Sequence, residues 1–505
     1  MRDHRDQTLL LLFFLCAAVL LTLWSWTGSP LNHDEVTYLV MARSMVENGN
    51  WLDLQFYGAT VHQRPPLAIW LLAASGAVTD FSLMGTRLPA MLMALLTLIF
   101  LALAVQELTP KDRQRTGMVA AALLLATPLF YFNARRPMTD TTFLAGAVAF
   151  VWCYLRAGRT PRWWLWAGIP AGWMLMSKGV VSALPLLAIA THLLLTSRRR
   201  EFTKRWLWLG LGVALLLATP WHLVQTIRHG GSFWQEYIGF NVLQRAGQAL
   251  FQKTPFTFYL QDLWESSPPL ALLFGSGLAY TSLQLWQHRP SAPARETAIW
   301  SSHLFVALWL LTAALPLSLA STRIEHYFLP ALPALAAAAA LGLAPLWTRH
   351  GYLFHSTLAV LTLLFFSGNA FHLTSPDYTP DQTRFARQIK SGPAPEARVV
   401  SINHYELAIF YFLDRSVDMR TTDPRFFEIV DSAPILHRIK GVTLEPPDQL
   451  AAKLRQGPFY ALTNSASLPL LCGPTGQQCG PAGPLSVTPG NHLFLVTNIT
   501  QPPHE

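Results

Sequence analysis

Charged residues are scarce in this chain of 505 residues. Asp, Glu, Lys and Arg together make up only 13% of it, whereas hydrophobic residues make up 51%. A soluble domain carries about 25% charged residues, so the deficit excludes an ordinary soluble protein and favours a polytopic membrane protein. The 18 Trp and 29 Phe are typical of side chains that lie at membrane interfaces and against lipid.

Motifs of nucleotide-driven chemistry are missing as well. The sequence has no P-loop, no Rossmann fingerprint, no GxSxG elbow and no HExxH helix. The formal net charge of +9 does not indicate a nucleic-acid partner, because the basic residues gather in short loops between apolar runs. We therefore expect membrane lipids rather than nucleic acid as partners.

Cysteine is rare, with four in the whole chain. Cys16 and Cys153 lie inside apolar runs, where they are expected to pack. Cys472 and Cys479 lie in a tail rich in Gly and Pro and would close a small disulfide loop in an oxidising compartment. Their spacing does not fit a zinc ribbon. No chelating cluster is visible, which leaves open a divalent cation shared by two Asp.

Apolar runs predict eleven transmembrane helices. The first run, 8–27, is long for a signal peptide and lacks a small-residue cleavage site, so we expect a retained anchor. The shorter run 67–79 is assigned to a surface loop. The other ten runs are 89–108, 116–133, 138–155, 163–177, 179–196, 206–227, 267–287, 298–320, 327–347 and 351–371.

Basic residues determine the predicted orientation. Alternation from a cytoplasmic N-terminus places five basic segments inside, whereas counting 67–79 as a span would place all five outside. These segments are 111–115, 156–162, 198–205, 288–295 and Arg349. The long first loop and the C-terminal tail would then lie on the outer side.

Two domains are expected. Residues 1–374 would form the transmembrane domain with its long first loop, 28–88, and residues 375–505 a soluble α/β domain. In the tail, 398–402 and 493–497 are predicted strands and 404–413 a predicted helix. A tail of this length can bury a core of its own.

Ionisable side chains at membrane depth are costly, so their clustering on one side is informative. Acids surrounded by several cations suit a phosphate-bearing substrate, which the cations would hold while an acid acts as a base or orients the acceptor. The candidates on the outer side are Asp34, Glu35, Arg64, Arg135, Arg136, Asp140, Lys178, Arg245, Arg323 and His326.

Each candidate also has a structural explanation. Asp34 and Glu35 could cap a helix that begins near Val36, and Asp140 could cap 141–157. Arg64 could reach the lipid headgroups, Lys178 could mark a tight turn, and His326 with Tyr327 could anchor the interface; these three explanations stay open.

Several motifs share one family pattern over roughly 8–345. The first loop contains HDEVTY, GNW and QRPPLAIW (33–70), and ARRPMTD (134–140), SKG (177–179), NVLQR (241–245) and HYFLPALPA (326–334) follow in order. Together they resemble lipid-carrier-dependent glycosyltransferases of the C-type membrane fold. That family includes bacterial lipid A aminoarabinose transferases and protein O-mannosyltransferases.

The resemblance implies roles for individual residues. Asp34 and Asp140 would be catalytic, and the donor phosphate or substrate would be bound by Arg64, Lys178, Arg245, Glu35, Arg135, Gln63, His326 and Tyr327. Gln63 stands where the family usually has Glu. Arg64 replaces the usual Lys, which changes a point donor into a planar fork.

The resemblance also implies an activity and a location. The chain would be an inverting glycosyltransferase of the bacterial inner membrane, with its active site and tail in the periplasm. It would transfer a monosaccharide from a polyprenyl (undecaprenyl) phosphate to lipid A or a related envelope glycolipid. The alternatives are a protein O-mannosyltransferase-like enzyme, a membrane transporter, and a non-catalytic partner in surface-glycan assembly.

Overall fold

The chain forms two compact units. The first consists of Met1–Trp26 with His62–Ser375, and the second of Thr27–Val61 with Pro376–Glu505. The sequence division placed the whole first loop with the transmembrane domain, whereas here Thr27–Val61 group with the C-terminal residues. This computed structural model describes residues 2–22, 33–248, 254–290, 297–370, 380–404, 408–415, 417–424, 427, 442–454, 456–473, 476–479 and 484–499.

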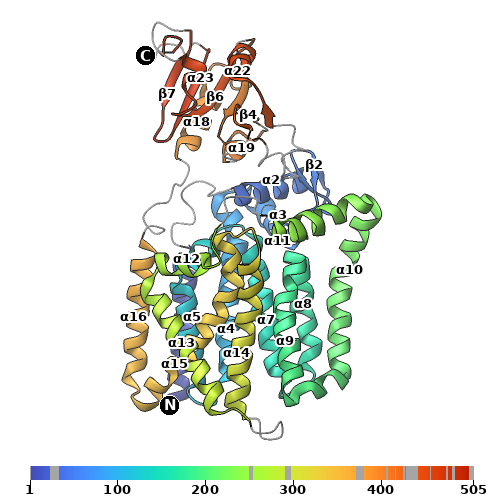
Figure 1. The fold of residues 1–505 in the computed structure, drawn as a ribbon, viewed down its shortest axis with the longest axis vertical. Coiled ribbons are helices and arrows are strands. Elements are labelled where there is room, and N and C mark those ends of the chain that lie inside the picture. Colours follow the sequence, from blue (N-terminus) through green and yellow to red (C-terminus); the bar gives the residue numbers. More distant parts are fainter. Residues whose placement is uncertain are drawn as a thin grey trace. The chain divides into compact units, whose positions relative to one another are not determined.

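The first unit is helical (Figure 1). Each of the eleven apolar runs of the sequence contains a helix. These helices are α1 (Arg2–Thr22), α4 (Leu83–Leu108), α5 (Arg113–Ala126) with α6 (Pro128–Ala134), α7 (Thr139–Ala157), α8 (Trp163–Lys178), α9 (Ala183–Leu195), α10 (Arg205–Trp234), α13 (Pro268–Gln287), α14 (Ala298–Leu319), α15 (Leu332–Arg349) and α16 (Tyr352–Gly368).

Not all of these helices pass a strict test for spanning a bilayer. Among the described residues, five are long and apolar enough, or six if the bent pair α5 and α6 counts as one span. That pair bends by 78° where Pro128 begins α6, because proline cannot continue the hydrogen-bond ladder of α5. Helices α8 and α9 follow each other through the short helix η1 (Gly179–Ser182) and form one apolar segment, Trp163–Leu195. The chain is therefore polytopic, and the count of eleven spans stays a prediction.

The run 67–79 forms a helix, α3 (Leu67–Thr79). Its 13 residues are fewer than the roughly 20 that a bilayer requires. The helix follows directly on Pro65 and Pro66, and Asp80 ends it in a left-handed conformation. Its length is consistent with the assignment of this run to the surface loop.

Small residues allow the helices of the first unit to approach closely. In α15, Ala336–Ala340 are all buried, and a Cβ at Gly277 of α13 would lie 2.4 Å from the backbone of Ala339. Helices α8 and α10 meet in the same way, since a Cβ at Gly210 would lie 2.0 Å from the carbonyl oxygen of Trp164. Close backbone packing of this kind is how membrane helices associate without a hydrophobic driving force.

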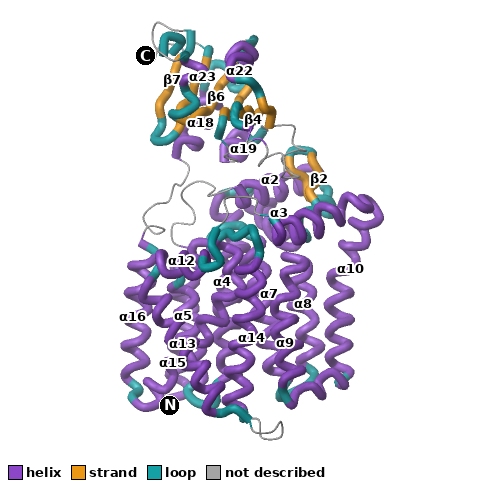
Figure 2. The backbone as a smooth tube through the Cα atoms, in the orientation of Figure 1, coloured by secondary structure: helices purple, strands orange, loops and turns teal. Residues whose placement is uncertain are grey.

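The second unit contains the β-structure of the described chain (Figure 2). Helix α2 (His33–Asn48) is followed by a hairpin of β1 (Leu54–Phe56) and β2 (Ala59–Val61). The C-terminal residues form a six-stranded sheet in the order β5-β4-β3-β6-β8-β7. Its strands are β3 (Arg398–Ile402), β4 (Asp418–Thr421), β5 (Val442–Leu444), β6 (Phe459–Asn464), β7 (Ser486–Pro489) and β8 (Leu493–Thr497).

Four neighbouring strands of the sheet, β5, β4, β3 and β6, are parallel, and β8 and β7 continue it antiparallel. Strands β3 and β8 confirm the two predicted strands. Helix α19 (Ala408–Leu413) covers the second part of the predicted helix, whose residues 405–407 lie outside the described chain. Among the described residues of this part, the other helices are α18 (Pro380–Ser391), α22 (Pro447–Leu454) and α23 (Pro469–Cys472).

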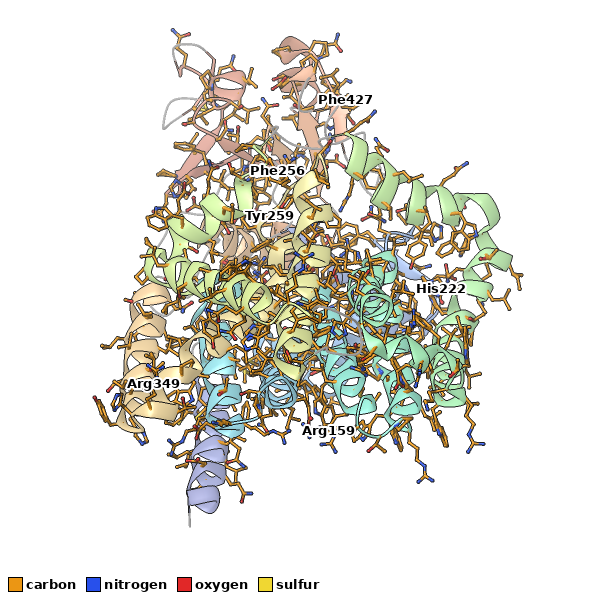
Figure 3. All side chains as sticks on the ribbon, turned by 60° about the horizontal axis from the view of Figure 1, so that its bottom comes forward. Arg159, His222, Phe256, Tyr259, Arg349 and Phe427 are labelled. Atoms are coloured by element: carbon orange, nitrogen blue, oxygen red, sulfur yellow. A yellow bond between two sulfur atoms is a disulfide. The ribbon has the colours of Figure 1, made fainter. Side chains whose placement is uncertain are left out.

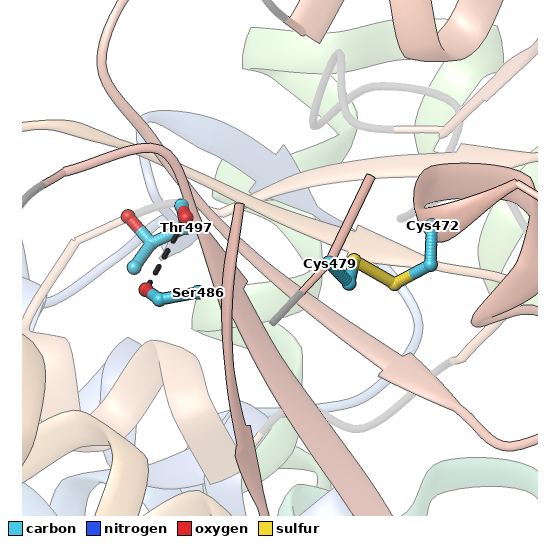
Figure 4. Close-up of a disulfide and its surroundings, with 4 residues drawn as sticks. All are labelled: Cys472, Cys479, Ser486 and Thr497. Carbon is cyan, nitrogen blue, oxygen red and sulfur yellow. Dashed lines mark hydrogen bonds between the residues drawn. A yellow bond between two sulfur atoms is a disulfide. The ribbon is translucent and has the colours of Figure 1, made fainter. Parts of the chain in front are cut away.

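A disulfide joins Cys472, at the end of α23, to Cys479 (Figure 4). Cys479 forms an isolated parallel β-bridge with Leu485. Leu485 belongs to the same hydrophobic core cluster as Val400 and Phe459. The side chain of Ser486 donates a hydrogen bond of 3.4 Å to the carbonyl of Thr497, which adds to the pairing of β7 with β8. The disulfide therefore fastens a loop onto the core of the sheet.

A buried carboxylate holds the turn that leads into β8. Asp381 of α18 accepts backbone N–H donors from Asn491, His492 and Leu493 at 2.7, 2.7 and 3.0 Å. Gly490 permits this approach, because a Cβ there would lie 2.4 Å from the carboxylate. Burial by itself would raise the pKa of Asp381, but the three donors outweigh it and hold the pKa below the ordinary value.

We predict that replacing Gly210 by Ala destabilises the first unit by about 1–3 kcal/mol, because the added methyl group would overlap Trp164. Gly212→Ala is the matched control on the same helix, since a Cβ at Gly212 meets nothing within 4 Å. Thermal unfolding in detergent measures both. Equal stabilities would show that α8 and α10 do not pack as closely as described.

We predict that Asp381→Asn speeds amide exchange at residues 491–493 about tenfold or more, because the charge-assisted bonds are lost. A lowered folded pKa means that the stabilisation is complete above pH ~4 and is lost as the pH falls through the folded value. Hydrogen exchange of the full chain, corrected for intrinsic rates, measures this. The control is Asp418→Asn, which alters an ion pair with Arg398 that is about 40% exposed. If Asp418→Asn speeds amide exchange at residues 491–493 as much as Asp381→Asn does, the prediction is refuted.

Candidate functional site

An ion pair lies at one end of the helices of the first unit. Asp140 is the second residue of α7, and its Oδ1 pairs with Nζ of Lys178, the last residue of α8. The side chains are only 4% and 18% exposed, so both charges are largely removed from solvent. The hydroxyl of Thr139 lies 3.5 Å from the other carboxylate oxygen. The two ends of α7 and α8 are thereby tied together by opposite charges.

The capping explanation for Asp140 is wrong. Helix α7 begins at Thr139, one residue before Asp140, and its N-cap is Met138. Met138 makes no capping hydrogen bond with its side chain. The Asp140 carboxylate accepts instead from Lys178, which belongs to another helix.

Tyr327 connects this pair to a second cation. Lys178 Nζ lies 5.3 Å from the centroid of the Tyr327 ring, and Arg245 Nη1 donates a hydrogen bond of 2.7 Å to the Tyr327 hydroxyl. The Arg245 guanidinium also lies over Phe240 at 5.1 Å. Asp140, Lys178, Tyr327 and Arg245, named here the central cluster, come from four segments of the chain.

Arg245 has an unused donor. Its Nε is buried and finds no hydrogen-bond acceptor among the residues that the structure describes. A buried donor of a charged group without a partner is costly, and in native proteins such a group calls for an explanation. An anion bound to the central cluster would satisfy it.

Gly179 places Lys178 where it can reach Asp140. Its φ of +54° ends α8 in a conformation that other residues avoid, and a Cβ there would lie 2.0 Å from the Tyr237 hydroxyl oxygen. His222 Nδ1 lies 2.8 Å from the Ala218 carbonyl, to which it can only donate. In the neutral ring Nε2 is then the acceptor, and the Tyr237 hydroxyl donates to it at 3.0 Å.

Tyr237 belongs to a π-helix, η3 (Gln235–Gln244), that contacts several candidate segments. Asn241 of η3 donates from Nδ2 to the backbone carbonyl of Gln63 at 2.7 Å and so holds the segment that carries Arg64. Arg245 follows directly at the end of η3. Stretches of π-helix are rare and frequent at functional sites.

Sequence reasoning missed Tyr237 and Asn241. Asn241 lies in the NVLQR motif, from which only Arg245 was selected, and Tyr237 carried no sequence signal. Tyr237 can be recognised only from the structure, in which its hydroxyl lies against Gly179.

The other cations of the first unit have different surroundings. Arg135 and Arg136 are buried between the end of α6 and the start of α7, and each guanidinium lies 4.4 Å from an aromatic ring, of Tyr131 and Phe132 respectively. The His326 ring lies 4.9 Å from that of Tyr327, beside the central cluster. Arg323 donates to the backbone carbonyls of Ser318 and Thr254 and thereby closes a loop.

Asp34 and Glu35 belong to the second unit. They lie in the first turn of α2, which begins at His33 rather than near Val36, and Glu35 is completely buried. Arg43 of the same helix pairs with Asp414 and lies 5.4 Å from the Tyr411 ring of α19. The helix that carries both acids is therefore fixed to the C-terminal residues.

No metal site accompanies these residues. Within the described ranges, no group of three or more His, Cys, Asp or Glu could hold a metal ion. The central cluster contains one acid and two cations, a composition that suits an anion rather than a cation.

Part of the first unit matches a known family. The model of the dolichyl-phosphate-mannose-protein mannosyltransferases matches residues 63–223. This range contains Arg64, Asp140 and Lys178 and ends before Arg245.

Sequence relatives are found among the undecaprenyl phosphate-alpha-4-amino-4-deoxy-L-arabinose arabinosyl transferases. The chain is 27% identical to one from Pseudomonas fluorescens strain Pf0-1, over 59% of this chain and 51% of the relative. It is 29% identical to one from Pseudomonas savastanoi pv. phaseolicola, over 66% and 60%. The chain thus spans between half and three fifths of the length of these relatives.

Solved structures show the fold. ArnT from Cupriavidus metallidurans, in a crystal structure with undecaprenyl phosphate bound, matches with a TM-score of 0.73 and 16% identity over 97% of this chain and 98% of that one. The archaeal oligosaccharyltransferase AglB from Archaeoglobus fulgidus matches with 0.59 and 12% identity over 92% and 70%. The fold is that of these polytopic membrane glycosyltransferases, and the resemblance seen in the motifs is confirmed.

We predict that Lys178→Met destabilises the protein by about 3–5 kcal/mol, because it leaves the Asp140 carboxylate buried without its partner. The double variant Asp140→Asn with Lys178→Met removes both charges and should recover most of this loss. Lys111→Met, at an exposed position of the first unit, is the control. Chemical unfolding in detergent measures these three variants and Asp140→Asn alone. A double variant that loses as much as the sum of its single changes would show that the two residues are not coupled.

Proposed function

We propose that this protein is an inverting glycosyltransferase that moves a monosaccharide from a polyprenyl phosphate donor, undecaprenyl phosphate in bacteria, to a lipid A-type acceptor. The observation that carries the proposal is the partly buried Arg245, whose buried Nε has no acceptor among the described residues and which is joined through Tyr327 to Lys178 and Asp140. The fold and the arabinosyl transferase relatives support the same reaction class.

The central cluster fits the departure of a phosphate. When the bond from the sugar to the carrier phosphate breaks, the bond's electrons pass to the phosphate oxygen. A phosphate is already acidic, so it requires positive charge rather than a proton. Lys178 and Arg245 supply that charge in surroundings of low polarity, where it acts strongly. Arg64 is assigned the same role from its place beside Gln63.

Asp140 limits the charge of this site. Paired with Asp140, the Lys178 ammonium is neutralised and can stay buried while no phosphate is bound. A bound phosphate would share the ammonium with the carboxylate. In this role Asp140 orients the donor and keeps Lys178 in place, and it needs no proton transfer of its own.

Asp34 is assigned the role of base. It would take the proton of an acceptor hydroxyl as the oxygen attacks the anomeric carbon from the face opposite to the phosphate, which inverts the configuration. If the acceptor group is itself a phosphate, Asp34 would only orient it. Glu35, completely buried in the next position, would support the turn that presents Asp34. Gln63, Arg135, His326 and Tyr327 are assigned to substrate binding.

We propose the membrane topology that the sequence predicts. We place eleven spans in the bacterial inner membrane and the central cluster at the periplasmic end. Residues 375–505 form a periplasmic domain in this proposal. The disulfide between Cys472 and Cys479 supports that side of the membrane, because disulfides persist in oxidising compartments.

We predict that Asp34→Asn and Asp140→Asn each lower transfer at least about 100-fold, the usual effect of removing a general base or a charged positioning group. Membranes that contain each variant at matched expression are supplied with radiolabelled polyprenyl phosphate-linked sugar. Asp112→Asn, at the opposite end of the bundle, is the control and should retain activity.

Extraction of the labelled product into the lipid phase or the protein phase identifies the class of acceptor. Label in the lipid phase supports a lipid A-type acceptor, and label in the protein phase would replace it with a protein hydroxyl. Equal labelling by the wild type and both Asp variants would contradict the enzymatic function and favour a transporter or a scaffold.

A further inference from the structure

A second charged site lies at the other end of the first unit. Arg156, near the end of α7, is 16 residues from Asp140, which is about 24 Å along the helix axis. Around it gather Glu107, from the end of α4, Arg113, from the start of α5, and Arg159, in the loop before α8. None of these residues takes part in the central cluster.

One carboxylate serves three guanidinium groups here. Glu107 Oε1 lies 3.2 Å from Arg113 and 3.3 Å from Arg156, and its Oε2 lies 3.0 Å from Arg159. The Glu107 side chain is only 5% exposed, whereas the three Arg side chains are 37%, 39% and 56% exposed. Three positive charges against one negative charge leave a surplus of two. We name these four residues the arginine cradle.

The geometry leaves donors for a further anion. A guanidinium carries five N–H donors, and a carboxylate cannot satisfy three such groups at once. Arg113 uses Nε for the Gln106 carbonyl at 2.6 Å, while Arg156 and Arg159 have no acceptor besides Glu107 among the described residues. Arg159, labelled in Figure 3, is the most exposed of the three.

Apolar surface begins directly beside the cradle. The Arg156 guanidinium lies over the Trp163 ring at 5.0 Å, and Trp163 packs against Trp152 at 4.9 Å. One turn further along α8, Trp166 and then Ile169 are exposed. Arginine next to tryptophan at the end of an exposed apolar stripe is the arrangement that meets a lipid, with its headgroup at the cations and its chains along the stripe.

We propose that the arginine cradle binds the phosphodiester headgroup of an anionic phospholipid from the leaflet at this end of the protein. Arg156 and Arg159 donate to the phosphate oxygens, and Glu107 holds the guanidinium groups in place between the ends of α4, α5 and α7. The exposed face of α8 receives the acyl chains. This site is independent of the proposed transfer reaction, because it shares no residue with it.

The test removes the surplus charge and keeps the internal pair. Arg156→Gln with Arg159→Gln leaves Arg113 to pair with Glu107, so no unpaired charge is created. The matched control is Arg199→Gln with Arg200→Gln, which removes two exposed charges from the helix η2 (Ser197–Thr203). Native mass spectrometry of the full chain in detergent measures binding of phosphatidylglycerol and of phosphatidylcholine.

The wild type should bind phosphatidylglycerol more tightly than phosphatidylcholine, and the cradle variant should weaken phosphatidylglycerol binding about tenfold or more, at about 1 kcal/mol for each lost charge. The control variant should stay within about twofold of the wild type, since it leaves the cradle intact. Equal losses in both variants, or equal binding of the two lipids by the wild type, would overturn the site. Competition by inorganic phosphate as strong as by the lipid would overturn the assignment to a lipid.

Discussion

The buried ion pair between Asp140 and Lys178 is the interaction on which the candidate site depends. A buried charge without a partner is expensive, so each residue of the pair requires the other. The pair fixes where α7 begins relative to where α8 ends, and Gly179 supplies the turn that makes the contact reachable. Tyr327 then sets the distance between Lys178 and Arg245.

The π-helix η3 supports this arrangement from the outside. Tyr237 packs against Gly179, Asn241 holds the carbonyl of Gln63, and Arg245 leaves the end of η3 toward Tyr327. One short element thus positions the segments that carry Arg64, Lys178 and Arg245. Helix α7 carries a charged cluster at each end, because it begins at the central cluster and ends at the arginine cradle. In the central cluster Asp140 pairs with one cation, Lys178, whereas in the arginine cradle Glu107 pairs with three Arg side chains.

Local sequence signals predicted the fold well where burial in lipid dominates. Apolar length placed a helix in every predicted run, and the predicted strands 398–402 and 493–497 coincide with β3 and β8. The break at Pro128 was missed, because the apolar run 116–133 continues through it. The grouping of Thr27–Val61 with the C-terminal residues could not be predicted, since it depends on contacts such as Arg43 with Asp414, far apart in the sequence. Family motifs pointed to Asp140, Lys178 and Arg245, whereas Tyr237 acts through spatial contact alone.

The claim that the central cluster holds a carrier phosphate is tested most directly by binding, without any transfer. Undecaprenyl phosphate and undecaprenol differ only in the phosphate, so their affinities for the full chain in detergent isolate its contribution. The wild type should bind the phosphate form about tenfold tighter or more, and Arg245→Gln should remove most of that preference, because a charged hydrogen bond contributes about 1.5–3 kcal/mol. Equal affinity of the wild type for both lipids, or an unchanged preference in Arg245→Gln, would contradict the phosphate site.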